Sequence, residues 1–171
     1  MNVVLTGFMG TGKSCVGRRL SETLHVPFLD VDEAIEQRSG RKIADLFSTE
    51  GEAAFRAIER QVVLEISQTK SSVIATGGGA LLDARNREAL EKNGTLVCLT
   101  ATPATLVQRL HSDSKRPLLK GEGPLVERIE RLLKERQSIY QSCPLHVATD
   151  GKSIAQVVEA VFNAIQPYLK K

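Results

Sequence analysis

Short apolar runs alternate along this chain with longer stretches in which apolar residues recur every three or four positions. The short, mostly apolar runs predict buried strands at residues 2–6, 27–31, 72–76, 95–100 and 146–149. The longer stretches predict helices at residues 13–24, 32–39, 43–47, 50–68, 84–92, 103–111, 125–141 and 153–169. Strands separated by helices require right-handed crossovers, which produce a parallel sheet with helices on both faces. The pattern therefore predicts a three-layer α/β/α fold around a five-stranded parallel sheet, in a single domain that spans residues 1–171.

One segment follows neither pattern. Residues 112–124 are rich in glycine, proline and charged side chains, a composition typical of a mobile lid and not of a boundary between domains. In open parallel sheets the ligand crevice lies at the carboxyl ends of the strands. The residues that follow each predicted strand, together with this lid, are therefore the candidates for chemistry.

The segment directly after the first strand carries the most informative motif. Residues 7–14, GFMGTGKS, fit the pattern G-x-x-x-x-G-K-[ST], with a predicted strand before them and a predicted helix after them. In such a loop successive backbone N–H groups point at phosphate oxygens, and the helix adds its positive N-terminal end. Lys13 supplies a charge to the β- and γ-phosphates, and the Ser14 hydroxyl is placed to ligate Mg²⁺. The alternative is a glycine-rich turn without a ligand.

Two carboxylates, Asp30 and Asp32, stand at the end of the second strand. In an extended segment residues two apart point the same way, so both carboxylates are expected to face one crevice. One of them can then hold Mg²⁺ through water while the other accepts a proton from a substrate hydroxyl. Alternatively, Asp32 is the N-cap of the helix that follows, and a cap can also be a ligand.

Arg56 and Glu59 are three residues apart on one predicted helical face, where they can form an ion pair. On the surface such a pair contributes only about 0.3–0.5 kcal/mol. The functional alternative is that Glu59 fixes the guanidinium so that Arg56 binds a carboxylate in a fork.

Three consecutive glycines, Gly77, Gly78 and Gly79, follow the third strand. Because glycine costs conformational entropy on folding, three in a row indicate that the backbone closely approaches another group. The alternative is a flexible turn between a strand and a helix.

Two further arginines are candidates. Arg116 lies in the predicted lid before Pro117, which restricts its backbone, and a lid arginine can neutralise the charge that develops in phosphoryl transfer. Arg136 lies in the predicted helix 125–141, from which it can reach the crevice. Taken alone, each residue is more often structural than functional: Arg116 as an exposed basic side chain and Arg136 as part of a solvated helix face.

Size and charge narrow the class of protein. The chain has 171 residues and a mass of 18.7 kDa, which suits one ordinary domain. Its 23 Lys and Arg against 20 Asp and Glu give a net charge of +3, which is too small and too scattered for a nucleic-acid-binding surface. The pI ≈ 8.8 suits a protein that binds small anions. Three cysteines without C-x-x-C spacing predict free thiols, and no apolar run has the length of a membrane span. We expect a soluble, cytoplasmic protein and a monomer.

Taken in order along the chain, these motifs resemble those of the shikimate kinases, small phosphotransferases of the nucleoside-monophosphate-kinase group with the P-loop kinase fold. The matching segments run nearly from end to end: residues 7–14 and 28–32, Phe55-Arg56 with Glu59, residues 77–79 and 116–119, and Arg136 with Tyr140. The phosphate loop alone is shared by many unrelated nucleotide enzymes, whereas this ordered set is specific.

The resemblance implies that ATP phosphorylates the 3-hydroxyl of shikimate, giving shikimate 3-phosphate and ADP, a step of chorismate and aromatic amino-acid biosynthesis that uses Mg²⁺. The implied catalytic residues are Lys13, Asp32 and Arg116, with Asp32 as a general base. The resemblance also implies that the helices near residues 32–60 bind the acceptor. The implied substrate-binding residues are Asp32, Arg56, Gly77, Gly78, Gly79 and Arg136. The implied nucleotide-binding residues are Gly10, Thr11, Gly12, Lys13, Ser14, Cys15, Arg109, Arg116 and Lys152. Ser14 is the implied metal ligand, and Asp30 acts on the metal through water.

The chain departs from the family pattern at several positions. Cys15 stands where the family usually has Ser or Thr, and a thiol is a weaker donor to the α-phosphate, so somewhat looser nucleotide binding is expected. After Arg136 the family commonly reads proline-leucine-tyrosine, whereas this chain has Ser138-Ile139-Tyr140, and the acidic residue often found two beyond the tyrosine is Ser142.

Two other functions are compatible with the phosphate loop. A gluconate-kinase-like enzyme would share the fold and lid but need a different acceptor pocket, and Arg56, Gly77–Gly79 and Arg136 argue against it. A nucleotide-switch module needs a water-positioning residue and partner-facing loops, and the chain lacks the guanine-reading N-K-x-D stretch.

Overall fold

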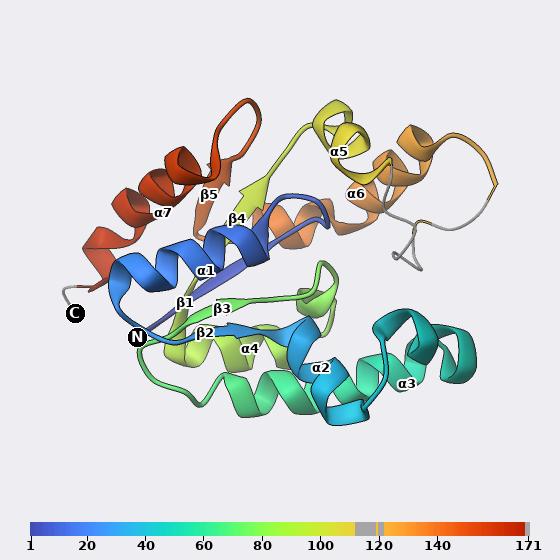
Figure 1. The fold of residues 1–171 in the computed structure, drawn as a ribbon, viewed down its shortest axis with the longest axis horizontal. Coiled ribbons are helices and arrows are strands. Elements are labelled where there is room, and N and C mark those ends of the chain that lie inside the picture. Colours follow the sequence, from blue (N-terminus) through green and yellow to red (C-terminus); the bar gives the residue numbers. More distant parts are fainter. Residues whose placement is uncertain (112–118, 120–121, 170–171) are drawn as a thin grey trace.

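The computed structural model describes residues 1–111, 119 and 122–169. At its centre lies a five-stranded sheet in which all neighbouring strands are parallel, in the order β2-β3-β1-β4-β5 (Figure 1). The strands are β1 (Asn2–Gly7), β2 (Phe28–Asp30), β3 (Val73–Ala75), β4 (Gly94–Thr100) and β5 (Leu145–Ala148). The predicted parallel sheet is therefore confirmed, with β2 and β3 one residue shorter at each end than the sequence pattern indicated.

Helices connect the strands. They are α1 (Lys13–Leu24), α2 (Val31–Ser39), α3 (Ile43–Ile66), α4 (Ala84–Asn93), α5 (Pro103–Leu110), α6 (Leu125–Gln141) and α7 (Ile154–Leu169), with a short 3₁₀ helix η1 (Ala80–Leu82) before α4. The expectation of two helices over residues 43–47 and 50–68 is confirmed, because α3 consists of two helical segments that meet at a kink, although the kink lies at Gly51 and not at residues 48–49. The break between them is confined to Gly51, with φ 80° and ψ 175°, because glycine adopts this conformation without a steric penalty.

The helices cover both faces of the sheet, as the crossovers require (Figure 1). Val3 and Leu5 of β1 pack with Val16 of α1 and with apolar residues of α7 in one core. Val4 points to the opposite face and belongs to a second core with residues of α2, α3, α4, α5 and α6. Because successive residues of a strand face opposite sides, a strand covered on both faces carries consecutive apolar residues, as β1 does at Val3, Val4 and Leu5.

Within the described residues, no helix has the length and apolar character that a membrane crossing requires.

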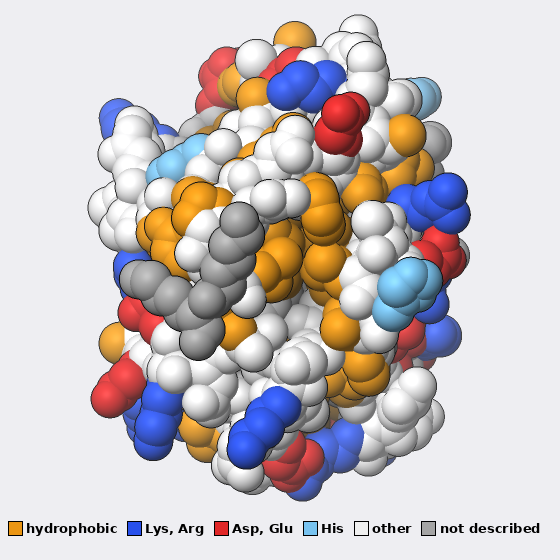
Figure 2. Space-filling model, turned by 90° about the vertical axis from the view of Figure 1, so that its left-hand side faces the viewer, with side chains coloured by type: hydrophobic (Ala, Val, Ile, Leu, Met, Phe, Trp, Pro, Cys, Tyr) orange, Lys and Arg blue, Asp and Glu red, His pale blue; other side chains and the backbone are white. Residues whose placement is uncertain are grey.

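Figure 2 shows the side of the molecule that lies on the left in Figure 1. Among the residues that the structure describes, Lys and Arg side chains lie on this face among Asp and Glu side chains, without a large patch of one sign.

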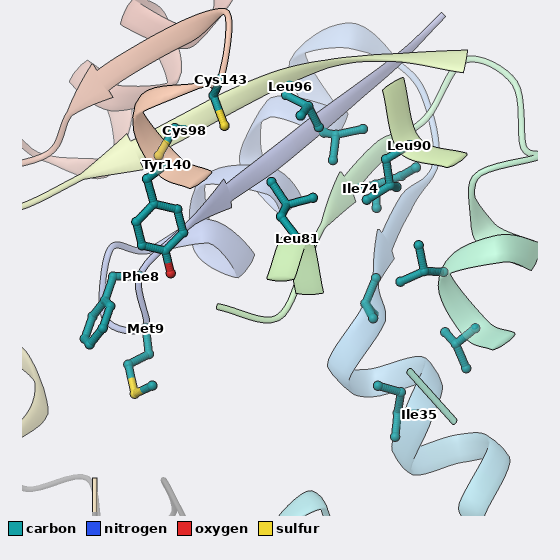
Figure 3. Packing of buried hydrophobic residues seen from close by; sticks show 14 of the residues in the cluster. Phe8, Met9, Ile35, Ile74, Leu81, Leu90, Leu96, Cys98, Tyr140 and Cys143 are labelled. Atoms are coloured by element: carbon teal, nitrogen blue, oxygen red, sulfur yellow. The ribbon is translucent and has the colours of Figure 1, made fainter. Parts of the chain in front are cut away.

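The second core extends to the phosphate loop (Figure 3). Phe8 and Met9 of this loop are buried, with 2% and 7% of their surface exposed. Tyr140 of α6 and the buried free thiols Cys98 and Cys143 belong to the same cluster. Apolar packing therefore anchors the loop on the side that faces away from its polar groups.

Gly17 allows α1 to lie close against the sheet. A Cβ atom at this position would stand 2.5 Å from Phe28 Cε2 and 3.3 Å from Leu5 Cδ1. Alanine normally stabilises a helix by about 1 kcal/mol relative to glycine, whereas overpacking a core costs about 1–3 kcal/mol. We therefore expect Gly17→Ala to lower the melting temperature by about 2–8 °C in thermal denaturation. Thr23→Ala, at an exposed position of the same helix, is the control and should leave it nearly unchanged; an equal or higher melting temperature for Gly17→Ala would contradict this packing.

Candidate active site

The carboxyl ends of β1, β2 and β3 meet at one edge of the sheet, where a cavity of about 580 Å³ opens. Its lining comes from the phosphate loop, the end of β2, α2, α3, the glycine run and α6. The lining residues are Met9, Ser14, Asp30, Asp32, Glu33, Glu36, Lys42, Ile43, Ala44, Asp45, Phe47, Phe55, Arg56, Glu59, Gly77, Gly78, Gly79 and Arg136. The fold thus brings all the candidate acceptor-binding residues to one cavity.

Lys13 is held inside the phosphate loop. Its Nζ donates hydrogen bonds to the carbonyl oxygens of Gly7 and Phe8, each at 2.9 Å, and the residue is only 9% exposed. Thr11 closes the loop, because its hydroxyl and its N–H both donate to the Phe8 carbonyl oxygen, at 2.7 and 3.3 Å. The ammonium group is therefore fixed as a point charge next to the backbone that precedes α1.

Ser14 and Asp30 are joined directly. The Ser14 hydroxyl donates to Asp30 Oδ2 at 2.6 Å, while Asp30 Oδ1 accepts from the backbone N–H groups of Asp32 at 2.9 Å and Glu33 at 3.4 Å. Asp30 is therefore the N-cap of α2, and the alternative that gave this role to Asp32 is wrong. Asp32 lies in the first turn of the helix and not in an extended segment, yet both carboxylates line the cavity as expected.

Arg56 is oriented by two carboxylates of its own helix. Its Nη1 donates to Glu59 Oε2 at 2.6 Å, and its Nε and Nη2 donate to Glu52 Oε1 at 3.3 and 3.1 Å. Glu59 has only 1% of its side chain exposed, so this is not the solvated surface pair that the sequence left open. Glu52 was not among the predicted site residues, although its i,i+4 spacing to Arg56 is a signal for such a pair.

The charges of this pair depend on burial. Burial lowers the pKa of Arg56, but the charge of Glu59 and its hydrogen bond outweigh this effect, so the pKa is raised and Arg56 stays charged. Burial also raises the pKa of the Glu59 carboxyl, which Arg56 opposes and the nearby Asp32 carboxylate reinforces. Glu59 therefore takes up a proton at a higher pH than an ordinary glutamate with a pKa of 4.5.

This raised pKa leads to a testable pH dependence. As the pH falls, protonation of Glu59 removes the anion that fixes Arg56, so the KM for an acceptor carboxylate should rise before ordinary glutamates titrate. The measurement is the acceptor KM between about pH 5 and pH 8 in the wild type and in Glu59→Gln. The variant should have a raised KM that no longer shows this increase on acidification. Parallel pH profiles for the two proteins would contradict the role of Glu59.

The three glycines lie against the charged residues of the cavity. A Cβ at Gly77 would stand 2.9 Å from Asp32 Oδ1, and a Cβ at Gly79 would stand 2.6 Å from Arg56 Nη2. At Gly78 the tightest contact of a Cβ would be with the backbone nitrogen of Met9 in the phosphate loop, at 3.2 Å. Side chains at Gly77 and Gly79 would displace the ionic groups, and one at Gly78 would press on the phosphate loop, which explains why the run is glycine and not an ordinary flexible turn.

Arg136 is buried, although it lies on a helix that the sequence alone allowed to be solvated. The residue is 3% exposed, and its Nε and Nη1 have no hydrogen-bond partner among the described residues. Its guanidinium carbon lies 5.9 Å from the centre of the Phe8 ring. One turn further along α6, the Tyr140 hydroxyl donates to the Gly78 carbonyl oxygen at 2.5 Å. A buried guanidinium that lines a cavity and has unused donors is suited to bind an anion, above all a carboxylate.

The remaining candidates lie outside the cavity. Arg109 donates to the carbonyl oxygen of Gly10 at 3.1 Å and to the hydroxyl and carbonyl oxygens of Thr149 at 2.9 and 3.0 Å. Lys152 Nζ donates to the Ala148 carbonyl oxygen at 2.8 Å. Both cations thus lie beside the loop after β5, and Arg109 also contacts the phosphate loop.

The last two predicted nucleotide-binding residues are Cys15 and Arg116. Cys15 is an exposed free thiol in the first turn of α1, directly after Ser14. Arg116 lies outside the described residues, as does most of the predicted lid 112–124.

The fold and the cavity together define a class of protein. Lys13 is fixed in a phosphate loop after β1, and the bonded pair Ser14 and Asp30 lines the same cavity as an acid and two arginines. These are the parts of a P-loop phosphotransferase with a small anionic acceptor.

Comparison with known proteins gives the family. The family model "Shikimate kinase" matches residues 9–166. A shikimate kinase of Symbiobacterium thermophilum is 43% identical over 169 residues, 97% of each chain, and that of Caldanaerobacter subterraneus subsp. tengcongensis is 40% identical over 163 residues, 95% of each chain. The solved structure of the shikimate kinase from Acinetobacter baumannii in complex with shikimate has a TM-score of 0.94 and 36% identity, covering 99% of this chain and 95% of that chain. The chain therefore belongs to the shikimate kinase family.

Proposed function

We propose that this protein transfers the terminal phosphoryl group of ATP to the 3-hydroxyl of shikimate, producing shikimate 3-phosphate and ADP for aromatic amino-acid biosynthesis. The observation that supports this acceptor most strongly is the buried Arg136, which lines the cavity together with Arg56 and Asp32 and has two nitrogens without a hydrogen-bond partner among the described residues. A gluconate-kinase-like enzyme and a nucleotide switch both lack support from the family to which the chain belongs.

The acceptor is bound through its carboxylate and its hydroxyl groups. Arg56 and Arg136 bind the carboxylate, because planar guanidinium groups match its two oxygens in a fork. Asp32 accepts hydrogen bonds from the ring hydroxyls, and the backbone of the run Gly77, Gly78 and Gly79 approaches the ring without side chains in the way. Asp32 also takes the proton of the 3-hydroxyl as this oxygen attacks the phosphorus.

The nucleotide is bound by the phosphate loop and the loop after β5. The backbone at Gly10, Thr11 and Gly12 and the Cys15 side chain contact the phosphates, and Arg109 and Lys152 contact the adenine side. Lys13 and Arg116 neutralise the charge that develops on the transferred group. Since the transition state is loose, most of the rate enhancement comes from alignment and charge neutralisation, and proton removal contributes less.

We assign Mg²⁺ to Ser14, with Asp30 acting through water. The donors fit, because the Ser14 hydroxyl and the Asp30 carboxylate are hard oxygen ligands that lie 2.6 Å apart at the mouth of the phosphate loop. Among the described residues no group of three or more His, Cys, Asp or Glu is placed to hold a metal, so Ser14 and Asp30 would hold the ion together with the nucleotide phosphates. When bound, Mg²⁺ neutralises charge on the phosphates.

The chain acts as one cytoplasmic domain over residues 1–171 and as a monomer, without nucleic-acid or membrane partners. Its functional parts are the phosphate loop 7–14, the acceptor helices near 32–60 and a lid at 112–124. Sedimentation velocity at micromolar concentration should give a single species near 18.7 kDa, and a dimer would overturn the monomer.

A coupled assay of ADP release tests the reaction. Purified protein with ATP and Mg²⁺ is measured with shikimate, with gluconate and without an acceptor, and ³¹P NMR identifies the product. Turnover that requires shikimate and yields its 3-phosphate is expected. Equal turnover without an acceptor would favour a nucleotide switch, and turnover only with gluconate would show that the acceptor pocket is misassigned. Removal of Mg²⁺ with a chelator should abolish turnover.

A further inference from the structure

The C-terminal end of α6 is held by an arginine from another helix. Arg87 of α4 donates through Nη2 to the carbonyl oxygen of Ser142 at 3.1 Å and through Nη1 to the Ser142 hydroxyl oxygen at 2.5 Å. Ser142 is the C-cap of α6, so its carbonyl oxygen lies at the negative end of the helix dipole. A cationic group from outside the helix therefore caps its last turn.

This contact is well defined on both sides. The Nε of Arg87 donates to Glu91 Oε1 at 2.8 Å, so the guanidinium is engaged along all its edges, and its side chain is 27% exposed. The Ser142 hydroxyl in turn donates to the Ile139 carbonyl oxygen at 2.7 Å. Two side chains that lie 55 residues apart thus form one continuous set of hydrogen bonds between α4 and α6.

The same end of α6 is attached to the acceptor cavity. The Tyr140 hydroxyl donates to the Gly78 carbonyl oxygen at 2.5 Å, and Tyr140 lies two residues before Ser142, the residue that Arg87 contacts. The glycine run leads through η1 into α4, and Asn86 Nδ2 fastens α4 to η1 through the Ala80 carbonyl oxygen at 3.0 Å. The glycine run, α4 and the end of α6 therefore form a closed structural unit with two crosslinks, one from Tyr140 and one from Arg87.

Arg136 depends on this unit for its position. Its Nε and Nη1 have no hydrogen-bond partner within the described part of the chain, so these two groups are oriented by the helix and by packing against Phe8. Ser142 lies six residues, or about 9 Å of helix, beyond Arg136. A shift or rotation of the last turns of α6 moves the guanidinium against a bound carboxylate, and a displacement of 1 Å in a binding group can reduce activity by about 10²-fold.

We infer that Arg87, outside the cavity, is a positioning residue of the acceptor site, which holds Arg136 in place through its contacts with the end of α6. The inference rests on the proposed binding of the acceptor carboxylate by Arg136.

The test compares Arg87→Met, Arg87→Lys and the control Arg85→Met. Arg85 lies on the same helix, is 66% exposed and contacts Asp83 instead of α6. For each protein we would measure the KM for shikimate and for ATP, kcat, the melting temperature, and the Kd for shikimate by calorimetry without nucleotide. Arg87→Met should raise the KM and Kd for shikimate roughly 3- to 30-fold while the KM for ATP stays within about twofold. Arg87→Lys should restore part of this loss, and Arg85→Met should resemble the wild type.

Two outcomes would overturn the inference. An unchanged shikimate KM in folded Arg87→Met would show that the contact does not position the site, and a parallel rise of both KM values would show a structural role only. If Arg87→Met does not fold, the shikimate KM is measured in Arg87→Lys and Ser142→Ala instead. Ser142→Ala is a milder change, because it removes only the hydroxyl that Arg87 contacts and keeps the contact with the carbonyl oxygen. A shikimate KM equal to that of the wild type in both would reject the inference. Absence of shikimate-dependent turnover in the wild type itself would instead reject the proposed function.

Discussion

Lys13→Ala is expected to lower kcat by about 10²- to 10³-fold, the effect of removing one fixed donor to charge that develops in a transition state. The wild-type Nζ is held by two loop carbonyl oxygens at 2.9 Å, so its charge is in place before the nucleotide arrives. The loss of these two hydrogen bonds costs about 1 kcal/mol each in stability, which leaves the fold intact.

The measurement is steady-state turnover with saturating ATP and shikimate, together with a thermal melt. Arg19→Ala is the matched control, because Arg19 lies on the same helix, is 66% exposed and pairs with Glu22. It should keep wild-type turnover. Wild-type turnover in Lys13→Ala would remove the central assignment of the phosphate loop.

Arg136→Met should raise the KM for shikimate by about 10²-fold and leave the KM for ATP nearly unchanged, because Arg136 lies in the acceptor cavity and its loss leaves the substrate carboxylate without a charged partner. The change should not lower the melting temperature. Burying the unpartnered Nε and Nη1 of a guanidinium costs free energy, and an apolar side chain of similar length removes this cost while it fills the same space.

This combination separates binding from folding. A variant that loses acceptor affinity while it keeps or gains stability identifies a group retained for function. Lys134→Met, an exposed position on the same helix, serves as the control and should change neither KM. Equal increases in both KM values for Arg136→Met would mean that Arg136 does not bind the acceptor.

The parts of the site that could be predicted from the sequence are those that depend on local pattern. The phosphate loop is continuous in sequence, so its glycines, Lys13 and Ser14 are recognisable without a structure. The boundary of α2 was harder, because Asp30 and Asp32 both suit a helix start. The structure gives the cap to Asp30, a difference of two residues that propensity does not resolve.

Arg136 and Arg87 illustrate what local pattern cannot reveal. An arginine in a charged helix has the same sequence signal whether it is solvated or buried, and Arg136 is 3% exposed only because α6 packs against the phosphate loop. The contact of Arg87 with Ser142 joins positions 55 residues apart, and each is unremarkable in its own segment.

By itself, the sequence determined the five strands, most of the helices, the phosphate loop and the set of candidate residues, because hydrophobic periodicity and loop chemistry act over a few neighbouring positions. Only the tertiary structure decided the strand order β2-β3-β1-β4-β5, the burial of Arg136 and the attachment of α6 to α4 and the glycine run. The physical reason is that these features are contacts between distant segments, and their geometry is set by how the layers pack and not by any one segment.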